Sequence, residues 1–159
     1  MKTFHTFLSS PWLTVRVQIA LGAIFVAASI PKLIDPPSFA HMIYNYRLVP
    51  GFALNAIALA MPWLEMLCGL ALILGVWRRS AATIIGAMLI AFIIAISINL
   101  SRDNAVNCGC FDMTSANKTH EELISEMEFV IVRDVGMLLM VAQILWGASR
   151  RSLESADRT

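Results

Sequence analysis

The chain has 159 residues, of which 58% are hydrophobic and only 14% are charged, and its formal net charge is +1. A soluble domain carries roughly 25% charged residues, so this composition excludes an ordinary soluble protein and favours one embedded in the lipid bilayer. The near-neutral charge and the absence of a long Lys/Arg tract exclude nucleic acid as a partner.

Four hydrophobic stretches are long enough to cross a bilayer, which takes about 20 helical residues each. They lie near Leu13–Ile30, Phe52–Trp77, Ala81–Leu100 and Phe129–Trp146. The sequence therefore predicts one all-α domain over residues 1–159, a transmembrane four-helix bundle. Small residues that allow close helix contacts are expected at Gly69, Gly75, Gly86 and Gly136.

The basic residues predict the orientation of the bundle, because cytoplasmic loops of membrane proteins are enriched in Lys and Arg. Basic residues flank the first span, fill the short turn at Arg78-Arg79 and open the C-terminal tail at Arg150-Arg151. Both termini are then cytoplasmic. The longer, mainly acidic loops Pro31–Gly51 and Ser101–Glu128 face the periplasm of a bacterial inner membrane.

The first outer loop is expected to contain a short helix. Pro31 should end the first span at Ile30, since proline disfavours helix in the residue before it. The following Ser38–Leu48 stretch has apolar residues at helical spacing behind Ser38 as a candidate N-cap. Its aromatic residues favour a position at the outer membrane interface.

Two further helix starts can be placed from local signals. Pro62 is expected to divide the second span, so that a main helix begins near Pro62 with Glu65 in its first turn. The run Thr119-His120-Glu121-Glu122 matches a capping box. A helix that begins there is expected to continue without a break into the fourth span.

The loop between spans three and four contains the pair Cys108-Gly109-Cys110, which is the main chemical signal of the sequence. So small a disulfide ring is strained, and strained disulfides are typically labile or catalytic. Two alternatives remain: a structural or intermolecular disulfide, and a soft-metal site helped by Asp112, Met113 or His120. No second cysteine pair completes a metal site, so none is predicted. The third cysteine, Cys68, is interpreted as apolar filling.

Ionisable side chains within membrane spans are functional candidates by default. The candidates form a predicted supporting polar cluster in the outer half of the bundle: Lys32, Glu65, Asn99, Arg102, Arg133 and Asp134. Glu65 is expected to pair with Lys32 or Arg133, which would reduce the cost of burial. The plainer interpretations are that Lys32 extends to the interface and that Arg133 and Asp134 form a simple charge pair.

Several stretches resemble those of the MauE/DoxX family of four-span bacterial membrane proteins, closest to its MauE-like branch. The matching stretches are Gly22–Phe25, Pro31–Pro36, Phe39-Ala40, Tyr46–Pro50, Pro62–Glu65, Gly69–Gly75, Asn107–Phe111 and Arg133-Asp134. Asp112 stands where the family pattern leads us to expect glycine. The resemblance implies a redox-associated membrane protein, linked to disulfide formation during maturation of a quinoprotein dehydrogenase or to quinone-coupled sulfur oxidation.

The resulting hypothesis is thiol–disulfide exchange at the periplasmic face. Cys108 and Cys110 would exchange with a thioredoxin-like or client protein, with quinone as the candidate cofactor. A nearby cation (Lys32, Arg102 or Arg133) would favour the thiolate, and Glu65 or Asp134 would handle the proton.

Two other classes of function remain open. The first is a non-catalytic anchor or assembly subunit of a larger oxidoreductase complex. The second is a small transporter or channel. The inner half of the spans is expected to lack polar residues, which argues against a continuous path across the membrane.

Overall fold

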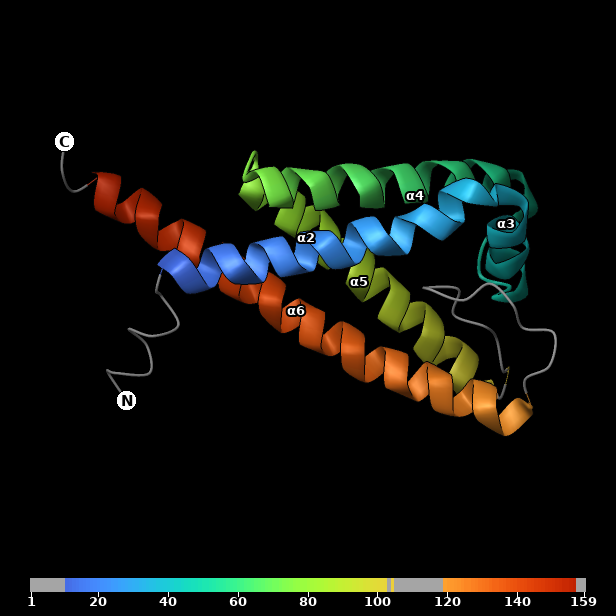
Figure 1. Cartoon of the computed structure of the whole chain (residues 1–159). Coiled ribbons are helices and arrows are strands. Elements are labelled where there is room, and N and C mark those ends of the chain that lie inside the picture. Colours follow the sequence, from blue (N-terminus) through green and yellow to red (C-terminus); the bar gives the residue numbers. More distant parts are fainter. Residues whose placement is uncertain (1–10, 103, 105–118, 157–159) are drawn as a thin grey trace.

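The computed structural model describes residues 11–102, 104 and 119–156, and every regular element in these ranges is a helix. In chain order, with the labels of Figure 1, the helices are α2 (Pro11–Ile34), α3 (Pro36–Asn45), α4 (Gly51–Leu74), α5 (Arg78–Ser101) and α6 (His120–Ala156). The predicted all-α fold is confirmed for the described part of the chain.

Four of these helices, α2, α4, α5 and α6, are long and apolar enough to cross a membrane. The apolar segments have mean hydropathies between 1.8 and 2.6. Large apolar side chains also cover their outer faces, such as Phe52 at 90% exposure and Val132 at 71%. Apolar side chains suit contact with lipid tails. The helices also satisfy their backbone hydrogen bonds internally, as a segment within the bilayer must. The chain is therefore a multi-pass membrane protein.

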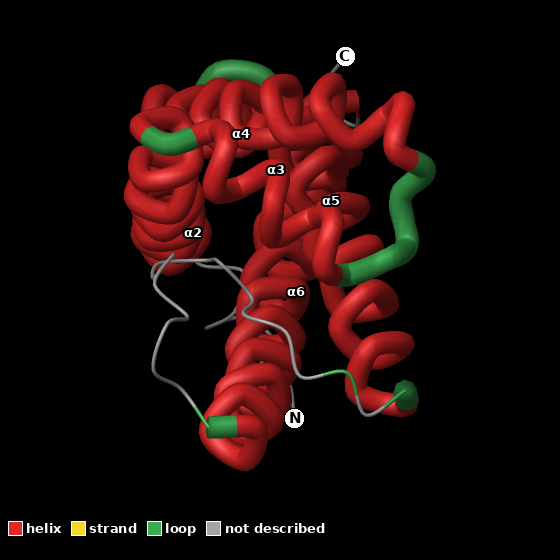
Figure 2. Tube along the Cα trace, turned by 90° about the vertical axis from the view of Figure 1, so that its right-hand side faces the viewer, coloured by secondary structure: helices red, strands yellow, loops and turns green. Residues whose placement is uncertain are grey.

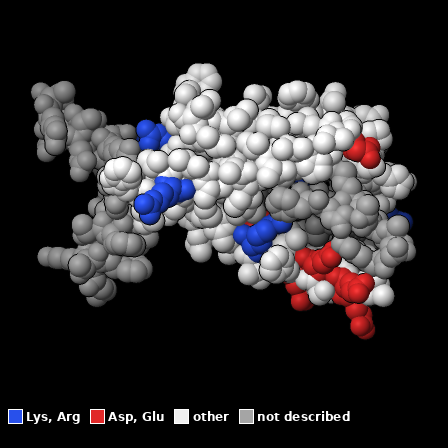
Figure 3. All heavy atoms as spheres, viewed as in Figure 1, with Lys and Arg blue, Asp and Glu red and all other residues white. Residues whose placement is uncertain are grey.

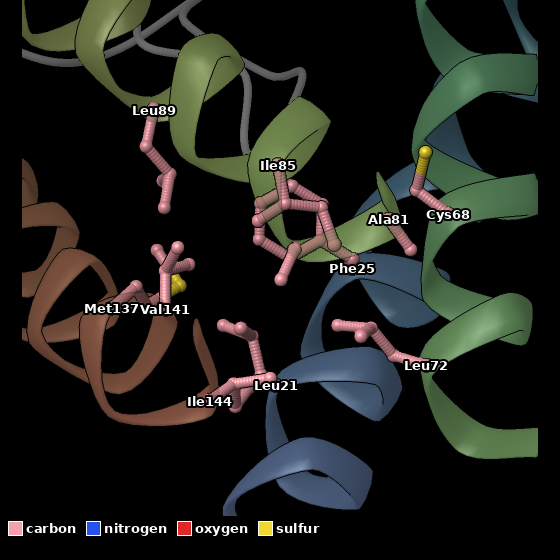
Figure 4. Packing of buried hydrophobic residues seen from close by; sticks show 11 residues of the cluster. Leu21, Phe25, Cys68, Leu72, Ala81, Ile85, Leu89, Met137, Val141 and Ile144 are labelled. Carbon is pink, nitrogen blue, oxygen red and sulfur yellow. The ribbon is translucent and has the colours of Figure 1, made fainter. Parts of the chain in front are cut away.

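The four long helices pack in two pairs. α2 lies along α4 and α5 lies along α6, with lesser contacts between the pairs, while the short α3 packs mainly on α4 (Figures 1 and 2). The main core lies where the pairs meet, and Figure 4 shows its side chains converging from α2, α4, α5 and α6. Leu21, Leu72, Ile85 and Ile144 are almost completely buried there.

Two facing glycines set the closest contact between α2 and α4. A Cβ atom added at Gly22 would lie 2.6 Å from the carbonyl oxygen of Gly69, and one added at Gly69 would lie 2.9 Å from that of Gly22. Neither position tolerates a side chain without movement of the backbone. The expectation for Gly69 is confirmed, whereas its partner Gly22 was not anticipated.

The other glycines have different roles. Gly86 packs near Val141, where an added Cβ would lie 3.2 Å from a methyl group. Gly75 instead ends α4 in a left-handed conformation with φ of 72°, which glycine adopts without strain. The expectation for Gly136 is wrong, because nothing lies within 4 Å of a Cβ added there.

Both predicted proline breaks are wrong. α2 continues through Pro31 to Ile34, and α4 runs unbroken from Gly51 to Leu74 with Pro62 inside it. A proline in a membrane helix removes one backbone donor, and packing against neighbouring helices makes this tolerable. As a consequence, Glu65 lies in the middle of a long helix and not in a first turn.

The short helix of the first outer loop is present, but its N-cap is Asp35 and not Ser38. The Asp35 carboxylate accepts hydrogen bonds from the Ser38 amide at 3.2 Å and from the Ser38 hydroxyl at 2.6 Å. These two bonds lower the pKa of Asp35. Proline at the start of the helix needs no hydrogen bond there, which favours this earlier beginning. Its position at the membrane interface stays a prediction.

The capping box of α6 is confirmed. The Thr119 amide donates to Glu122 Oε2 at 2.8 Å, and the Glu122 amide donates to the Thr119 hydroxyl at 3.4 Å. The helix then continues without interruption through the fourth span. Acidic side chains gather at this end of the molecule, whereas basic ones lie at the opposite end, near the middle and at the right-hand edge (Figure 3). The cytoplasmic position of the termini stays a prediction.

Candidate functional site

A buried ion pair joins α2 to α4. Lys32 Nζ lies 2.8 Å from each carboxylate oxygen of Glu65, and both residues are less than 10% exposed. The Lys32 ammonium also lies 5.2 Å from the centre of the Phe39 ring of α3, within the range of a cation–π contact. The predicted pairing of Lys32 with Glu65 is confirmed, and Lys32 does not extend into solvent.

A second ion pair lies on α6. Arg133 donates to Asp134 Oδ1 through Nε at 3.1 Å and through a terminal nitrogen at 2.9 Å. Asp134 is only 1% exposed. Its other carboxylate oxygen, Oδ2, is buried and has no hydrogen-bond partner among the described residues. Since a buried oxygen without a donor costs free energy, this atom is a candidate contact for water or a ligand.

The two ion pairs line one cavity of about 60 Å³, which can hold a few water molecules. All five described helices contribute to its wall. Its remaining lining is apolar and consists of Ile24, Phe25, Ala28, Phe39, Met61, Met88, Leu89, Phe92 and Met137. Two positive and two negative side chains therefore meet in an otherwise apolar chamber, which we call the charged cavity.

An apolar groove of about 200 Å³ adjoins the charged cavity. It is formed by α3, α4, α5 and the segment after α3, and it shares Phe39, Met61 and Phe92 with the cavity. Apart from the Tyr46 hydroxyl, the side chains that line it are hydrocarbon or thioether. A polar chamber next to an apolar groove is suited to a molecule with a polar head and an apolar body.

The charged cavity lies deep in the bundle. Glu65 is 14 residues from the start of α4 and Asp134 is 14 residues from the start of α6. At about 1.5 Å per residue, both lie roughly 20 Å from those helix ends. Glu65 and Asp134 therefore reach the cavity from deep within α4 and α6, whereas Lys32 reaches it from the last turn of α2.

Two members of the predicted polar cluster lie apart from this cavity. Asn99 is fully buried near the end of α5, where its side chain donates to the Ala95 carbonyl at 3.0 Å and accepts from Asn104 at 2.7 Å. Asn104 also donates to the Asn45 carbonyl at 3.3 Å, which ties this end to α3. Arg102 is exposed and forms the C-cap of α5. The cluster is thus divided between the cavity and the end of α5.

The cysteine predictions have different outcomes. Cys108 and Cys110 lie outside the described residues. Cys68 is a buried thiol in the main apolar core, as its interpretation as filling requires. Among the described residues, no group of three or more His, Cys, Asp or Glu side chains could hold a metal ion.

The expectation that the inner half lacks polar residues is wrong. Thr14 and Gln18 are at most 4% exposed in the first half of α2. The hydropathy of the span did not indicate these two residues, because one Gln or Thr changes the mean hydropathy of a span little. The main apolar core nevertheless separates them from the charged cavity, so the described helices form no continuous polar path.

Comparison with known proteins identifies a family that the chain matches. A family model described as "Methylamine utilisation protein MauE" matches residues 10–147. The chain is 31% identical to "Methylamine utilization protein MauE" of Methylophilus methylotrophus over 157 residues, covering 96% of this chain and 79% of that protein. It is 32% identical to the protein of the same name from Methylorubrum extorquens, covering 87% of this chain and 72% of that protein. No solved structure matches significantly.

Proposed function

The chain belongs to the MauE family, and we propose that it acts in methylamine utilisation as a membrane redox protein. Its family match and its four apolar spans make it a multi-pass bacterial membrane protein. The proposed activity is thiol–disulfide exchange through Cys108 and Cys110 with a thioredoxin-like or client protein at the periplasmic face.

Each round of this exchange would transfer two electrons and two protons. A thiolate of one dithiol attacks a sulfur of the other partner's disulfide, the old S–S bond breaks, and the second thiolate then closes a new disulfide. One disulfide is reduced and one dithiol is oxidised. Arg102, the exposed residue at the end of α5, is the described cation closest in sequence to the pair and would favour the thiolate.

The charged cavity is the observation that carries the redox proposal. A purely structural bundle gains little from burying ion pairs, because the loss of hydration offsets most of their attraction. Here Asp134 Oδ2 is buried without a donor among the described residues, and Asp134 lines a chamber that has room for water. This arrangement suits a group that accepts and releases a proton, as coupling of a dithiol to a membrane carrier requires.

A quinone fits the residues that line the cavity and the groove. Lys32 and Asp134 would hold its polar head, and Phe39, Met61 and Phe92 would pack against its apolar part. When bound, it would supply the acceptor or donor of two electrons that the dithiol needs. The chain's own contribution is to exclude bulk water and to hold the proton at Asp134 Oδ2.

The first test is a redox titration of the cysteines in the full chain within native membranes. Thiol trapping and mass spectrometry would follow Cys108 and Cys110 against graded dithiol buffers. We expect a reversible intramolecular disulfide with a potential above about −300 mV, the upper range of structural disulfides. The variant Cys68→Ser is the matched control and should titrate like the unchanged protein, because Cys68 lies in the core.

Function is tested by complementation. A methylamine-utilising bacterium that lacks its own MauE would receive this chain or its Cys108→Ser/Cys110→Ser variant, and growth on methylamine would be measured. We expect growth with the chain and with Cys68→Ser, and loss of growth with the double variant. Growth with the double variant would contradict the exchange mechanism and leave the non-catalytic anchor as the function.

A further inference from the structure

The apolar groove has a closed floor and an open side. Its floor is formed by Phe39 and Met42 of α3, which are at most 9% exposed. The exposed residues that line it include Ile57 of α4 and Ala91 of α5. α4 and α5 diverge from their shared turn toward the end where α3 lies (Figure 1). The groove therefore opens sideways between α4 and α5, with α3 behind it.

This open side lies within the membrane-spanning part of the protein. Ile57 is six residues from the start of α4, and Ala91 is ten residues from the end of α5. At about 1.5 Å per residue, they lie roughly 9 Å and roughly 15 Å from those helix ends. Both helices are apolar enough to span a bilayer. The open side consequently faces lipid tails, and a ligand would enter the groove from the bilayer.

Two alanines keep the groove open on the α5 side. Ala91 and Ala95 are one helical turn apart, and both line the groove. The residues around them on α5 are mostly large, such as Phe92, Ile94 and Ile96. A large side chain at either alanine would project into the groove volume of about 200 Å³. The short side chains at these two positions therefore leave the space that a ligand would fill.

The groove leads to the charged cavity, and this continuity selects among lipid-soluble occupants. The two share Phe39, Met61 and Phe92, and the centre of the Phe39 ring lies 5.2 Å from Lys32 Nζ. A phospholipid acyl chain that entered from the bilayer would place its methyl end beside the buried charges. A molecule with a polar head on an apolar tail would instead place its head in the charged cavity and leave its tail in the groove.

We infer that the apolar groove admits a quinone sideways from the bilayer and holds its isoprenoid tail, and that Ala91 and Ala95 determine the specificity for a tailed quinone. This assignment rests on the proposed function, to which it adds the class of quinone and its route of entry. Lipid tails are as apolar as the groove lining, so affinity for the tail comes from packing within the groove and not from leaving water. Filling the groove should therefore remove the preference for a tail and leave the head site unchanged.

Binding of two quinones to the full chain in detergent tests the inference. Native mass spectrometry would measure the affinity for a decyl-substituted benzoquinone and for the same ring without a tail. We expect the unchanged protein to bind the tailed form about tenfold more tightly. Ala91→Phe should remove this factor, which corresponds to about 1.4 kcal/mol, because its ring overpacks the tail position. The affinity for the tailless form should stay within about twofold. Ala95→Leu is a second variant with the same expected result.

The matched control is Ala87→Phe, because Ala87 is exposed on α5 one turn before Ala91 and is not among the residues that line the groove. It should retain the unchanged affinity for both quinones. Thermal unfolding would verify that each variant is folded. Equal losses for Ala87→Phe and Ala91→Phe, or equal affinity of the unchanged protein for the two quinones, would overturn the inference.

The possible outcomes separate the tail site from the proposed function. If the unchanged protein binds neither quinone, the quinone part of the proposed function fails and the tail site fails with it. If it binds the tailless quinone but shows no preference for a tail, only the tail site fails. Loss of a bound phospholipid in Ala91→Phe, without a change in quinone affinity, would assign the groove to an acyl chain and overturn the inference.

Discussion

At the scale of single residues, the burial of charge in the charged cavity depends on the ion pair between Lys32 and Glu65. Lys32 and Glu65 make two hydrogen bonds of 2.8 Å across the α2–α4 contact. Each is buried, so each charge depends on the other for its stability in the bundle. The two residues are 33 positions apart in the sequence and approach only because α2 and α4 run side by side.

This mutual dependence predicts a non-additive effect on stability. Lys32→Met or Glu65→Gln alone should lower the free energy of unfolding by about 3–5 kcal/mol, because each leaves one buried charge without its partner. The double variant Lys32→Met/Glu65→Gln should be closer to the unchanged protein than either single variant. Thermal and denaturant unfolding in the same detergent would measure the cycle.

The matched comparison is Arg102→Gln, at an exposed charged position outside the charged cavity. We expect a change within about 0.5 kcal/mol, which is usual for surface substitutions. If the effects of Lys32→Met and Glu65→Gln simply add in the double variant, the two residues do not stabilise each other and the pairing is wrong.

At the scale of helices, the α2–α4 contact positions Lys32 against Glu65. Gly22 and Gly69 bring the two backbones together, and Ser29 of α2 lies 3.6 Å from the Met66 sulfur of α4. The Ser29 hydroxyl also donates to the Val26 carbonyl at 2.7 Å. The contact thus extends from Gly22 through Val26, which packs against Gly69, to Ser29, and the ion pair follows one turn later.

A pair of glycine-to-alanine variants tests this contact. Gly22→Ala places a methyl group against the Gly69 carbonyl and should destabilise the bundle by about 1–3 kcal/mol, the usual cost of overpacking. Gly136→Ala adds the same atom on α6, where nothing lies within 4 Å. That variant should be neutral or stabilising by up to about 1 kcal/mol, because alanine favours helix.

Thermal unfolding in detergent would compare both variants with the unchanged protein. Equal stability of Gly22→Ala and Gly136→Ala would show that the two backbones are farther apart than the structure places them. A loss confined to Gly22→Ala would confirm the close contact.

At the scale of the whole molecule, charge and topology point to one orientation. Arg78 and Arg79 open α5 and no acidic residue lies in its first turn, whereas Glu121 and Glu122 lie in the first turn of α6. Because Lys and Arg favour the cytoplasmic side, we expect the α4–α5 turn inside and the Cys108-Gly109-Cys110 loop outside.

Labelling of intact cells with a maleimide that does not cross membranes tests this orientation. Reduced Cys108 and Cys110 should react from outside the inner membrane once the outer membrane is permeabilised. Ser80→Cys, in a variant without the native cysteines, should react only after the inner membrane is opened. The reverse pattern would contradict the predicted topology and remove the cysteines from the compartment where disulfides persist.

The sequence by itself determined the features that depend on neighbouring residues. Hydropathy predicted all four spans, since about 20 consecutive apolar residues suffice to cross a bilayer. The capping box at Thr119 was predictable because its partners lie three residues apart. The helix after Pro36 was also predicted, although the sequence placed its cap at Ser38 and not at Asp35, three residues earlier.

The tertiary structure decided what depends on distant residues. It joined Lys32 to Glu65, left Asn99 outside the cavity, and paired Gly69 with a glycine 47 positions away. It also carried two helices through Pro31 and Pro62, where local preference predicts a break. The physical reason is the same in each case. Packing against another helix contributes more free energy than the local conformational preference, and no pattern of neighbouring residues specifies which helix will pack there.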